Sequence, residues 1–280
     1  MKLANDNFPI PKGTIIKSKS WDVRYGDFYS HRGMLGFIVL ATDLVMEDNI
    51  IRLTPEGVGI SINRIPCKTE VNNTYLKQQL AMLPASAAMI QPDQPPALIC
   101  YACTSGSILN GVQNCIDAIK AGAPNSDAMT LVTGVVDAMR TIGAKDIVVG
   151  TPYLDEVNSV ELDFLIDSGF NVLDIQGLNV SDGAEMGRID PQFIKEFAIS
   201  IDRPDADCIF ISCGGIRSID VIDEIEEVVN KPVITSNQAM MWSCLRRIGI
   251  ADNLKGYGRL FKRDIHLNKP NYLKNPYLFA

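Results

Sequence analysis

Short apolar runs alternate with amphipathic helical stretches along this chain, and that alternation limits the fold more than any other feature. The apolar runs are predicted strands, at 34–41, 58–65, 97–103, 146–150, 171–176, 208–212 and 232–236. Helical spacing follows them, as in the run Ile108, Val112, Cys115 and Ile119. Short apolar strands that alternate with amphipathic helices predict a parallel α/β architecture.

The pattern occurs twice. Ile38 to Thr42 matches Ile147 to Thr151 at an offset of 109 residues, and Asn49 matches Asn158 at the same offset. Cys103 matches Cys213 at an offset of 110. An offset this constant predicts two similar Rossmann-like (flavodoxin-like) parallel α/β domains, related by pseudo-two-fold symmetry, with the active site between them.

The repeat also gives domain boundaries. We predict a first domain from residues 33–127 plus 237–258 and a second from 128–236. Residues 1–32 and 259–280 are predicted to be terminal arms that pack on the core, on a neighbouring subunit, or stay partly disordered. Two arms are compatible with a homo-oligomer such as a dimer or tetramer.

Two cysteines stand where an apolar strand meets a helix. Cys103 precedes Thr104-Ser105-Gly106-Ser107, and Cys213 precedes Gly214-Gly215. Helix N-termini attract anions and lower thiol pKa values, so both turns are candidate sites of reactive thiols. Ligands of open α/β sheets bind at the carboxyl ends of the strands. If the two edges face each other, the thiols approach one ligand from opposite sides; the alternative is that both are small packing residues.

Composition excludes several classes of function. The seven cysteines are an odd number and do not resemble a disulfide framework, and two histidines leave a zinc site unsupported. The C-x-x-C at Cys100 and Cys103 leaves a redox dithiol open. A formal net charge of −7 argues against binding to nucleic acid or to an acidic membrane surface. No apolar run approaches about 18 residues, and the N-terminal segment has no apolar signal stretch, so a cytoplasmic protein is expected.

Several motifs together resemble one family. They are Cys-Thr-Ser-Gly-Ser from 103, Thr-Pro-Tyr from 151 with Asn158, Ser-Cys-Gly-Gly from 212, and the run from 231 to 239 followed by Trp242 and Leu245-Arg246. Their order and spacing, from about 33 to 249, resemble the aspartate/glutamate racemase superfamily, in the branch of maleate cis–trans isomerase and arylmalonate decarboxylase. Residues 41–44 and 66–70 are most similar to the ectoine-utilisation (EutA) members, which implies a place in amino acid metabolism and ectoine catabolism.

The resemblance implies a function and a set of roles. It implies chemistry without a cofactor or metal, on a small carboxylate held between two cysteines, Cys103 and Cys213. Thr104, Ser105, Tyr153 and the N–H groups around Cys213, Gly214 and Gly215 would hold the substrate carboxylate, and Asn158 would add an amide.

Two departures from the family pattern bear on the substrate. Asp43 stands where maleate isomerases carry Asn, and this negative charge disfavours a simple dicarboxylate and favours a substrate with an amino group. Gly214-Gly215 follows Cys213 as in the decarboxylase, but the decarboxylase lacks the first cysteine, so two thiols favour racemisation or isomerisation.

Three functions therefore remain open. One is a racemase or isomerase acting on an amino acid, an N-acyl amino acid or a dicarboxylate through both thiols. The second is a malonate-type decarboxylase that uses Cys213 alone. The third is a non-catalytic carboxylate-binding protein. Either catalytic route is expected to need at least one lowered thiol pKa.

Overall fold

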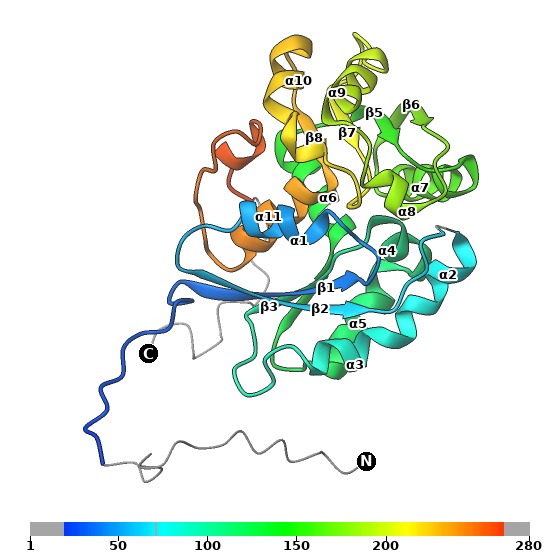
Figure 1. Ribbon diagram of the computed structural model, residues 1–280. Helices are drawn as coiled ribbons and strands as arrows, with labels where there is room; N and C mark the ends of the chain where they lie inside the picture. Colours follow the sequence, from blue (N-terminus) through cyan, green and yellow to red (C-terminus); the bar gives the residue numbers. More distant parts are fainter. Residues whose placement is uncertain (1–19, 71, 266–280) are drawn as a thin grey trace, which may run out of the picture.

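Two parallel four-stranded sheets form the framework of the computed structural model, which describes residues 20–70 and 72–265 (Figure 1). The strands are β1 (Gly33–Leu40), β2 (Val58–Ile65), β3 (Leu98–Tyr101), β4 (Asp127–Thr130), β5 (Asp146–Thr151), β6 (Asn171–Gly177), β7 (Cys208–Ile211) and β8 (Val233–Thr235). The first sheet has the order β2-β1-β3-β4 and the second the order β6-β5-β7-β8, with every pair parallel. The equal strand orders confirm the predicted two-domain α/β fold, and both follow the start of the flavodoxin order.

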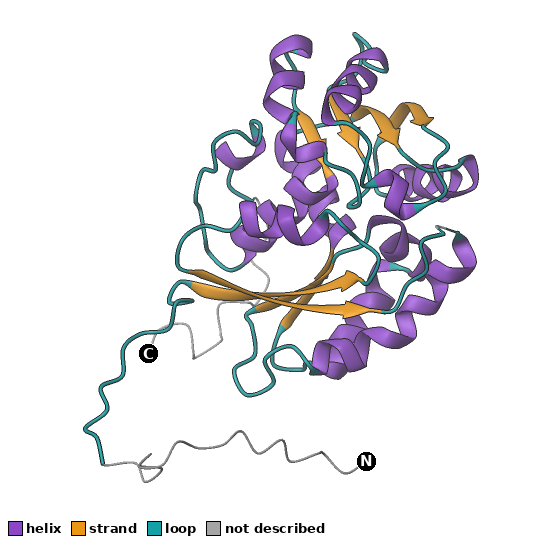
Figure 2. Ribbon diagram, viewed as in Figure 1, coloured by secondary structure: helices purple, strands orange, loops and turns teal. Residues whose placement is uncertain are grey.

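Helices cover both sheets (Figure 2). They are α1 (Met46–Arg52), α2 (Asn73–Gln78), α3 (Leu83–Ala88), α4 (Thr104–Asn110), α5 (Val112–Gly122), α6 (Leu131–Ile142), α7 (Asp155–Asp167), α8 (Gly183–Met186), α9 (Pro191–Ser200), α10 (Ile222–Val229) and α11 (Ser236–Arg247). Short 3₁₀ turns are η1 (Gln79–Met82), η2 (Ser218–Asp220) and η3 (Leu260–Lys262). Within the described ranges, no helix has both the length and the apolar character needed to cross a membrane.

The helix predicted after Cys103 is in fact two helices. Gly111, with φ of +80°, ends α4 and starts α5 in a new direction. Of the four residues on the predicted apolar face, Cys115 and Ile119 of α5 are buried. The other two, Ile108 and Val112, are half-buried. A glycine adopts positive φ without steric penalty, so local backbone freedom overrides the continuous helical spacing.

The two sheets meet through α6 and α11, which pack against each other between them. Both begin with a threonine capping box, at Thr130 and Thr235. A Cβ on Gly134 would lie 2.9 Å from the carbonyl oxygen of Ala239, so glycine permits the close approach of these helices. Every residue of α11 from Ser236 to Arg246 is buried.

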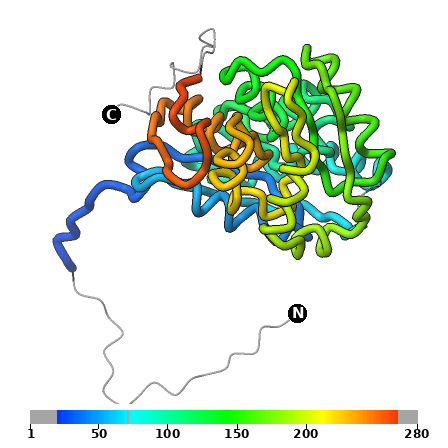
Figure 3. Tube along the Cα trace, turned by 90° about the horizontal axis from the view of Figure 1, so that it is seen from above, coloured from blue at the N-terminus to red at the C-terminus, as the bar shows by residue number. Residues whose placement is uncertain are grey.

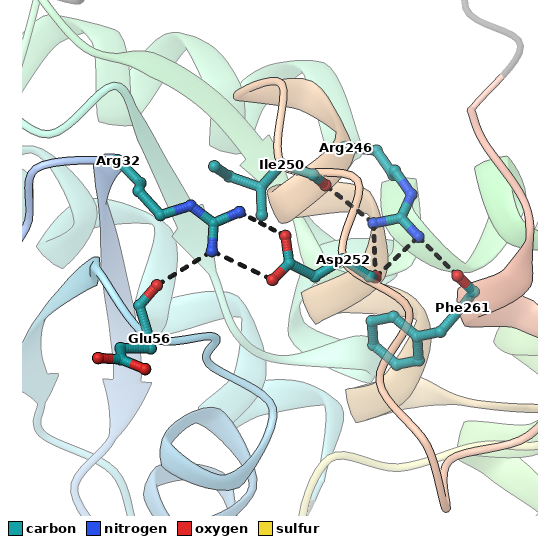
Figure 4. Close-up of polar contacts among 6 residues, drawn as sticks. All are labelled: Arg32, Glu56, Arg246, Ile250, Asp252 and Phe261. Carbon is teal, nitrogen blue, oxygen red and sulfur yellow. Dashed lines mark hydrogen bonds and ion pairs between the residues drawn. The ribbon is translucent and has the colours of Figure 1, made fainter.

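The segment after α11 is tied to the body of the protein. The Arg32 guanidinium forms a bidentate ion pair with Asp252 and donates to the Glu56 carbonyl oxygen (Figure 4). Leu260 and Phe261 are buried, so the start of the predicted C-terminal arm packs on the core. Residues 20–29 extend outward from the body of the protein (Figure 3) and are exposed. The remainder of both predicted arms, 1–19 and 266–280, lies outside the described residues.

The predicted domain boundary between residues 127 and 128 falls inside β4, which pairs with β3 in the first sheet. The division of the chain into these domains stays a prediction.

Candidate active site

A cavity lies between the two domains, at the carboxyl edges of both sheets. The first domain contributes the loop after β1, the loop after β2 and the start of α4, and the second contributes Tyr153, α8 and the turn after β7. The cavity has a volume of about 60 Å³. Among the sequence-predicted site residues, those on its wall are Asp43, Cys103, Thr104, Ser105, Tyr153, Cys213, Gly214 and Gly215.

Cys103 occupies the N-cap position of α4. Its Sγ accepts a hydrogen bond of 3.3 Å from the Gly106 N–H, and the residue is 7% exposed. The Tyr101 hydroxyl, which donates to Gln79 Oε1, lies beside it. A Cβ on Gly106 would lie 2.9 Å from this Sγ and 2.6 Å from Gln79 Oε1, so glycine is required at that position.

Cys213 has a strained backbone, with φ of +98°. A non-glycine residue in that region requires support from its surroundings. The Cys213 N–H donates to Ser236 Oγ at 3.0 Å, and the Sγ accepts from the Gly215 N–H at 3.3 Å. The residue is 6% exposed. The two bonds fix the direction of the thiol at the end of β7.

Ser236 connects the two cysteine turns. Its Oγ lies 3.1 Å from Thr104 Oγ1 and accepts a hydrogen bond from the Cys213 N–H. One buried hydroxyl therefore contacts both the residue after Cys103 and the backbone of Cys213. Cys103, Cys213 and Tyr153 all line the same cavity. The two thiols therefore share one small space rather than separate pockets.

The predicted lowering of the thiol pKa values is wrong for this structure. Burial raises the pKa of Cys103 to about 11, although the Gly106 N–H lowers it in the expected sense. Burial likewise raises the pKa of Cys213 to about 12, against the lowering effect of the Tyr153 hydroxyl and the Gly215 N–H. A dry site disfavours the charged thiolate more than a helix N-terminus stabilises it.

These raised pKa values predict slow, pH-dependent alkylation of Cys103 by iodoacetamide. Only the thiolate reacts, so the rate is expected to rise about tenfold per pH unit between pH 7 and 10 without a plateau, because the pKa of about 11 lies above this range. Peptide mass spectrometry after timed labelling measures the rate at Cys103. A plateau reached below pH 8 would contradict the raised pKa.

One carboxylate oxygen of Asp43 accepts hydrogen bonds at the start of α1, and the other lies close to the turn that contains Cys213. Its Oδ1 accepts from the Val45 and Met46 N–H groups at 2.8 and 2.7 Å at the start of α1. Its Oδ2 would lie 3.9 Å from a Cβ on Gly215. Burial raises the pKa of Asp43 above its ordinary value, and its charge in turn raises the pKa of Cys213.

Asn158 is not on the cavity wall in this structure. It is buried on α7, where its Oδ1 accepts from the Thr151 hydroxyl at 2.6 Å and its amide packs against Gly177. Its predicted contact with substrate stays a prediction. The structure does not support the redox dithiol of the C-x-x-C motif. Cys100 lies beside Cys244 in the core and not beside Cys103.

Four of the lining residues that sequence reasoning did not assign to the site lie in the loop after β2. Cys67, Lys68, Thr69 and Glu70 line the cavity with Tyr75 and Gln79. Lys68 Nζ lies 2.9 Å from the Tyr75 hydroxyl, and the Thr69 carbonyl oxygen accepts from the Gly183 N–H, which joins this loop to α8. The sequence did hold a signal for these residues. Residues 66–70 follow β2 and therefore lie at the same sheet edge as Cys103, where ligands of parallel sheets bind.

Comparisons with known proteins agree with this fold. The sequence profile of a family described as arylmalonate decarboxylase matches residues 99–261. The arylmalonate decarboxylase of Bordetella bronchiseptica is 30% identical over 135 residues, which is 47% of this chain and 56% of that protein. The maleate isomerase of Nocardia farcinica is 25% identical over 241 residues, 82% of this chain and 96% of that protein. The crystal structure of maleate isomerase Iso from Pseudomonas putida S16 superposes with a TM-score of 0.76 at 22% identity, and the match covers 82% of this chain and 98% of that one.

Proposed function

The chain belongs to the arylmalonate decarboxylase family, and from that premise we propose that it is a cofactor-independent racemase or isomerase of a small carboxylate. Cys103 and Cys213 would act as two opposed thiols. One observation carries the proposal: thiols from equivalent turns of two domains line a single small cavity, with Tyr153 close to both.

Proton transfer is the first route that this arrangement supports. The thiolate form of one cysteine, a minor form at neutral pH because its pKa is raised, removes the proton from the carbon next to the carboxylate. The electron pair moves onto the carboxylate as an enediolate. The thiol on the other side returns a proton, so the configuration inverts. N–H groups at the start of α4 have no partner within the helix and can stabilise the developing charge, with the hydroxyls of Thr104 and Ser105 beside them.

Addition and elimination form the second route. A thiolate adds to one carbon of a C=C bond, the neighbouring carbon takes the electron pair, and rotation about the new single bond precedes loss of the thiolate. A structure of the Nocardia farcinica maleate isomerase, in a cysteine-to-serine mutant, holds a covalently bound succinylcysteine intermediate. That chemistry supports the proposal that one thiol of this chain acts as a nucleophile.

A malonate-type decarboxylase is the second candidate. The match to the Bordetella decarboxylase at 30% identity favours it, as does the Gly214-Gly215 pair after Cys213. In this reaction the C–CO₂ bond breaks, the electron pair enters the enediolate, and Cys213 donates the proton. Cys103 would have no role.

Asp43 supports a substrate that carries an amino group. Its Oδ2 lies near the Cys213 turn, and its charge would repel a second carboxylate at that end of the cavity. Two acidic residues, Asp43 and Glu70, line the cavity against one cation, Lys68. We therefore expect amino acids or their derivatives to be better substrates than maleate.

A screen in D₂O tests the function directly. Amino acids, N-acyl amino acids, dicarboxylates and arylmalonates are incubated with the enzyme, and deuterium incorporation, chirality and CO₂ release are followed by NMR and chiral chromatography. Exchange with inversion, or cis–trans conversion, supports the proposal, whereas CO₂ release alone supports the decarboxylase. Tight binding without exchange of any of these compounds would indicate a binding protein and overturn the proposal.

The Asp43→Asn variant separates the substrate classes in the same screen. Removal of the charge is expected to lower turnover of amino substrates about tenfold and to raise that of dicarboxylates, because one unpaired charge contributes about 1–3 kcal/mol. An unchanged ratio between the two classes would contradict a role of Asp43 in substrate choice.

A further inference from the structure

A buried glutamate lies behind the cavity and has no role in the mechanism above. Glu161 is in the middle of α7 and is 2% exposed. Both of its carboxylate oxygens are fully buried, and neither has a hydrogen-bond partner. An unsatisfied buried carboxylate is too unfavourable to be an ordinary structural group, so this position requires an explanation.

The Ser212 hydroxyl is the group that could provide the missing hydrogen bond to the Glu161 carboxyl. Ser212 Oγ is itself buried without a hydrogen-bond partner. It lies close enough to Glu161 to lower the pKa of the carboxyl, but no hydrogen bond between the two is formed. Two partnerless polar groups therefore adjoin each other, and a small rotation of either side chain would join them.

Ser212 places this pair next to the reactive turn. It directly precedes Cys213, whose backbone has the strained φ of +98°. Its N–H donates to the Gly150 carbonyl oxygen at 2.8 Å, which fixes the end of β7 against β5. A hydrogen bond to the Ser212 side chain would hold the one residue that joins this strand to the strained turn.

Tyr153 provides a second connection. The charge of Glu161 raises the pKa of Tyr153, and the Tyr153 hydroxyl lowers the pKa of Cys213 by hydrogen bonding. The phenol thus lies within electrostatic range of both groups. Among the residues that the structure describes, burial and the Ser212 hydroxyl are the influences on the Glu161 carboxyl, and no cation compensates a charge there.

We propose that Glu161 is a positioning residue: a neutral carboxylic acid that forms a hydrogen bond with the Ser212 hydroxyl and so holds the Cys213 turn and keeps its surroundings uncharged. This inference rests on the proposed function only in giving Cys213 a chemical role. Its test requires no substrate.

The direction of the effect follows from the charge. Burial raises the pKa of Glu161 to about 7, so the carboxyl is neutral below that pH and becomes ionised above it. An ionised carboxylate near Tyr153 and Cys213 disfavours the Cys213 thiolate. Above pH 7 the wild-type Cys213 should therefore react more slowly than it would beside a neutral side chain.

The experiment is timed alkylation of Cys213 by iodoacetamide in the full chain from pH 6 to 9.5, measured by peptide mass spectrometry. Glu161→Gln keeps the shape of the neutral acid and cannot ionise. Its Cys213 is expected to react at the wild-type rate at pH 6 and about fivefold faster at pH 9, which corresponds to roughly 1 kcal/mol between charged and neutral neighbours. Difference infrared spectra of wild type against Glu161→Gln should show the carbonyl stretch of a protonated carboxyl at pH 6 and lose it at pH 9.

Two further variants make the test specific. Glu226→Gln is the matched control, because Glu226 is also a buried glutamate of the second domain but bonds to the Val233 and Arg259 N–H groups; its Cys213 profile should equal that of wild type. Ser212→Ala removes the group that favours the ionised carboxylate, so the loss of the infrared band should move to higher pH. Identical Cys213 profiles for wild type and Glu161→Gln, or no protonated-carboxyl band in the wild type, would overturn the proposal even if the screen finds a racemase. If Glu161→Gln does not fold, the wild-type and Ser212→Ala spectra, with the carboxyls labelled by ¹³C-glutamate, decide the question in the same way.

Discussion

Cys103→Ser and Cys213→Ser are each expected to lower turnover of the true substrate about a thousandfold, because a positioned acid, base or nucleophile contributes about 10²–10⁴-fold. Serine keeps the size and the hydrogen bonds of each thiol but has a far higher pKa. Turnover and deuterium incorporation, measured on the best substrate of the screen, give the loss at each position.

The pattern of the two losses distinguishes the candidate functions. A racemase that uses both thiols loses inversion in both variants, whereas a decarboxylase that uses Cys213 alone keeps CO₂ release in Cys103→Ser. Cys208→Ser is the matched control, since Cys208 is a buried thiol of β7 that lies away from the cavity. If both serine variants retain full turnover, the two-thiol proposal fails.

The architecture could be predicted because its signals are local and repeated. The strands have three to eight residues, and most of them are apolar runs between turns. The offset between Cys103 and Cys213 reflects two sheets with the same strand order. Element boundaries were less accurate. The strand predicted at 97–103 is the shorter β3, Leu98–Tyr101, and the helical run from Ile108 to Ile119 is divided between α4 and α5.

The chemical state of the site could not be predicted from the turns alone. The position of Cys103 at a helix N-terminus correctly predicted that the Gly106 N–H lowers its pKa. The net pKa, however, depends on how completely the two domains exclude water from the thiol. That exclusion comes from residues distant in sequence, such as Tyr153 from the second domain and Gln79 from the first. A sequence pattern does not show that these distant residues come together. For the same reason the sequence did not distinguish Glu161, which is buried, from the other acidic residues of α7.

Arg246→Met is expected to lower the free energy of unfolding by about 3 kcal/mol, the range found when one partner of a buried charged hydrogen-bond network is removed. Arg246 is 8% exposed, and its guanidinium donates to the carbonyl oxygens of Ile250, Asp252 and Phe261 at 2.7 to 3.2 Å (Figure 4). It also donates to the Arg263 carbonyl oxygen at 3.1 Å. Methionine fills a similar volume but donates to none of them. Urea unfolding followed by circular dichroism measures the loss.

The effect should be concentrated in the segment after α11, because all the carbonyl oxygens that Arg246 bonds to lie there. The Trp242 indole N–H also donates to the Arg263 carbonyl oxygen, and Arg32 holds Asp252 from the other end of the chain. Hydrogen exchange in Arg246→Met should therefore accelerate first at 250–263, while β5 and β7 keep their protection. Arg203→Met is the control: this arginine is exposed and pairs with exposed Asp205, so its replacement should change the unfolding free energy by less than about 1 kcal/mol. Equal effects of the two replacements would show that the Arg246 network adds no more stability than a surface ion pair.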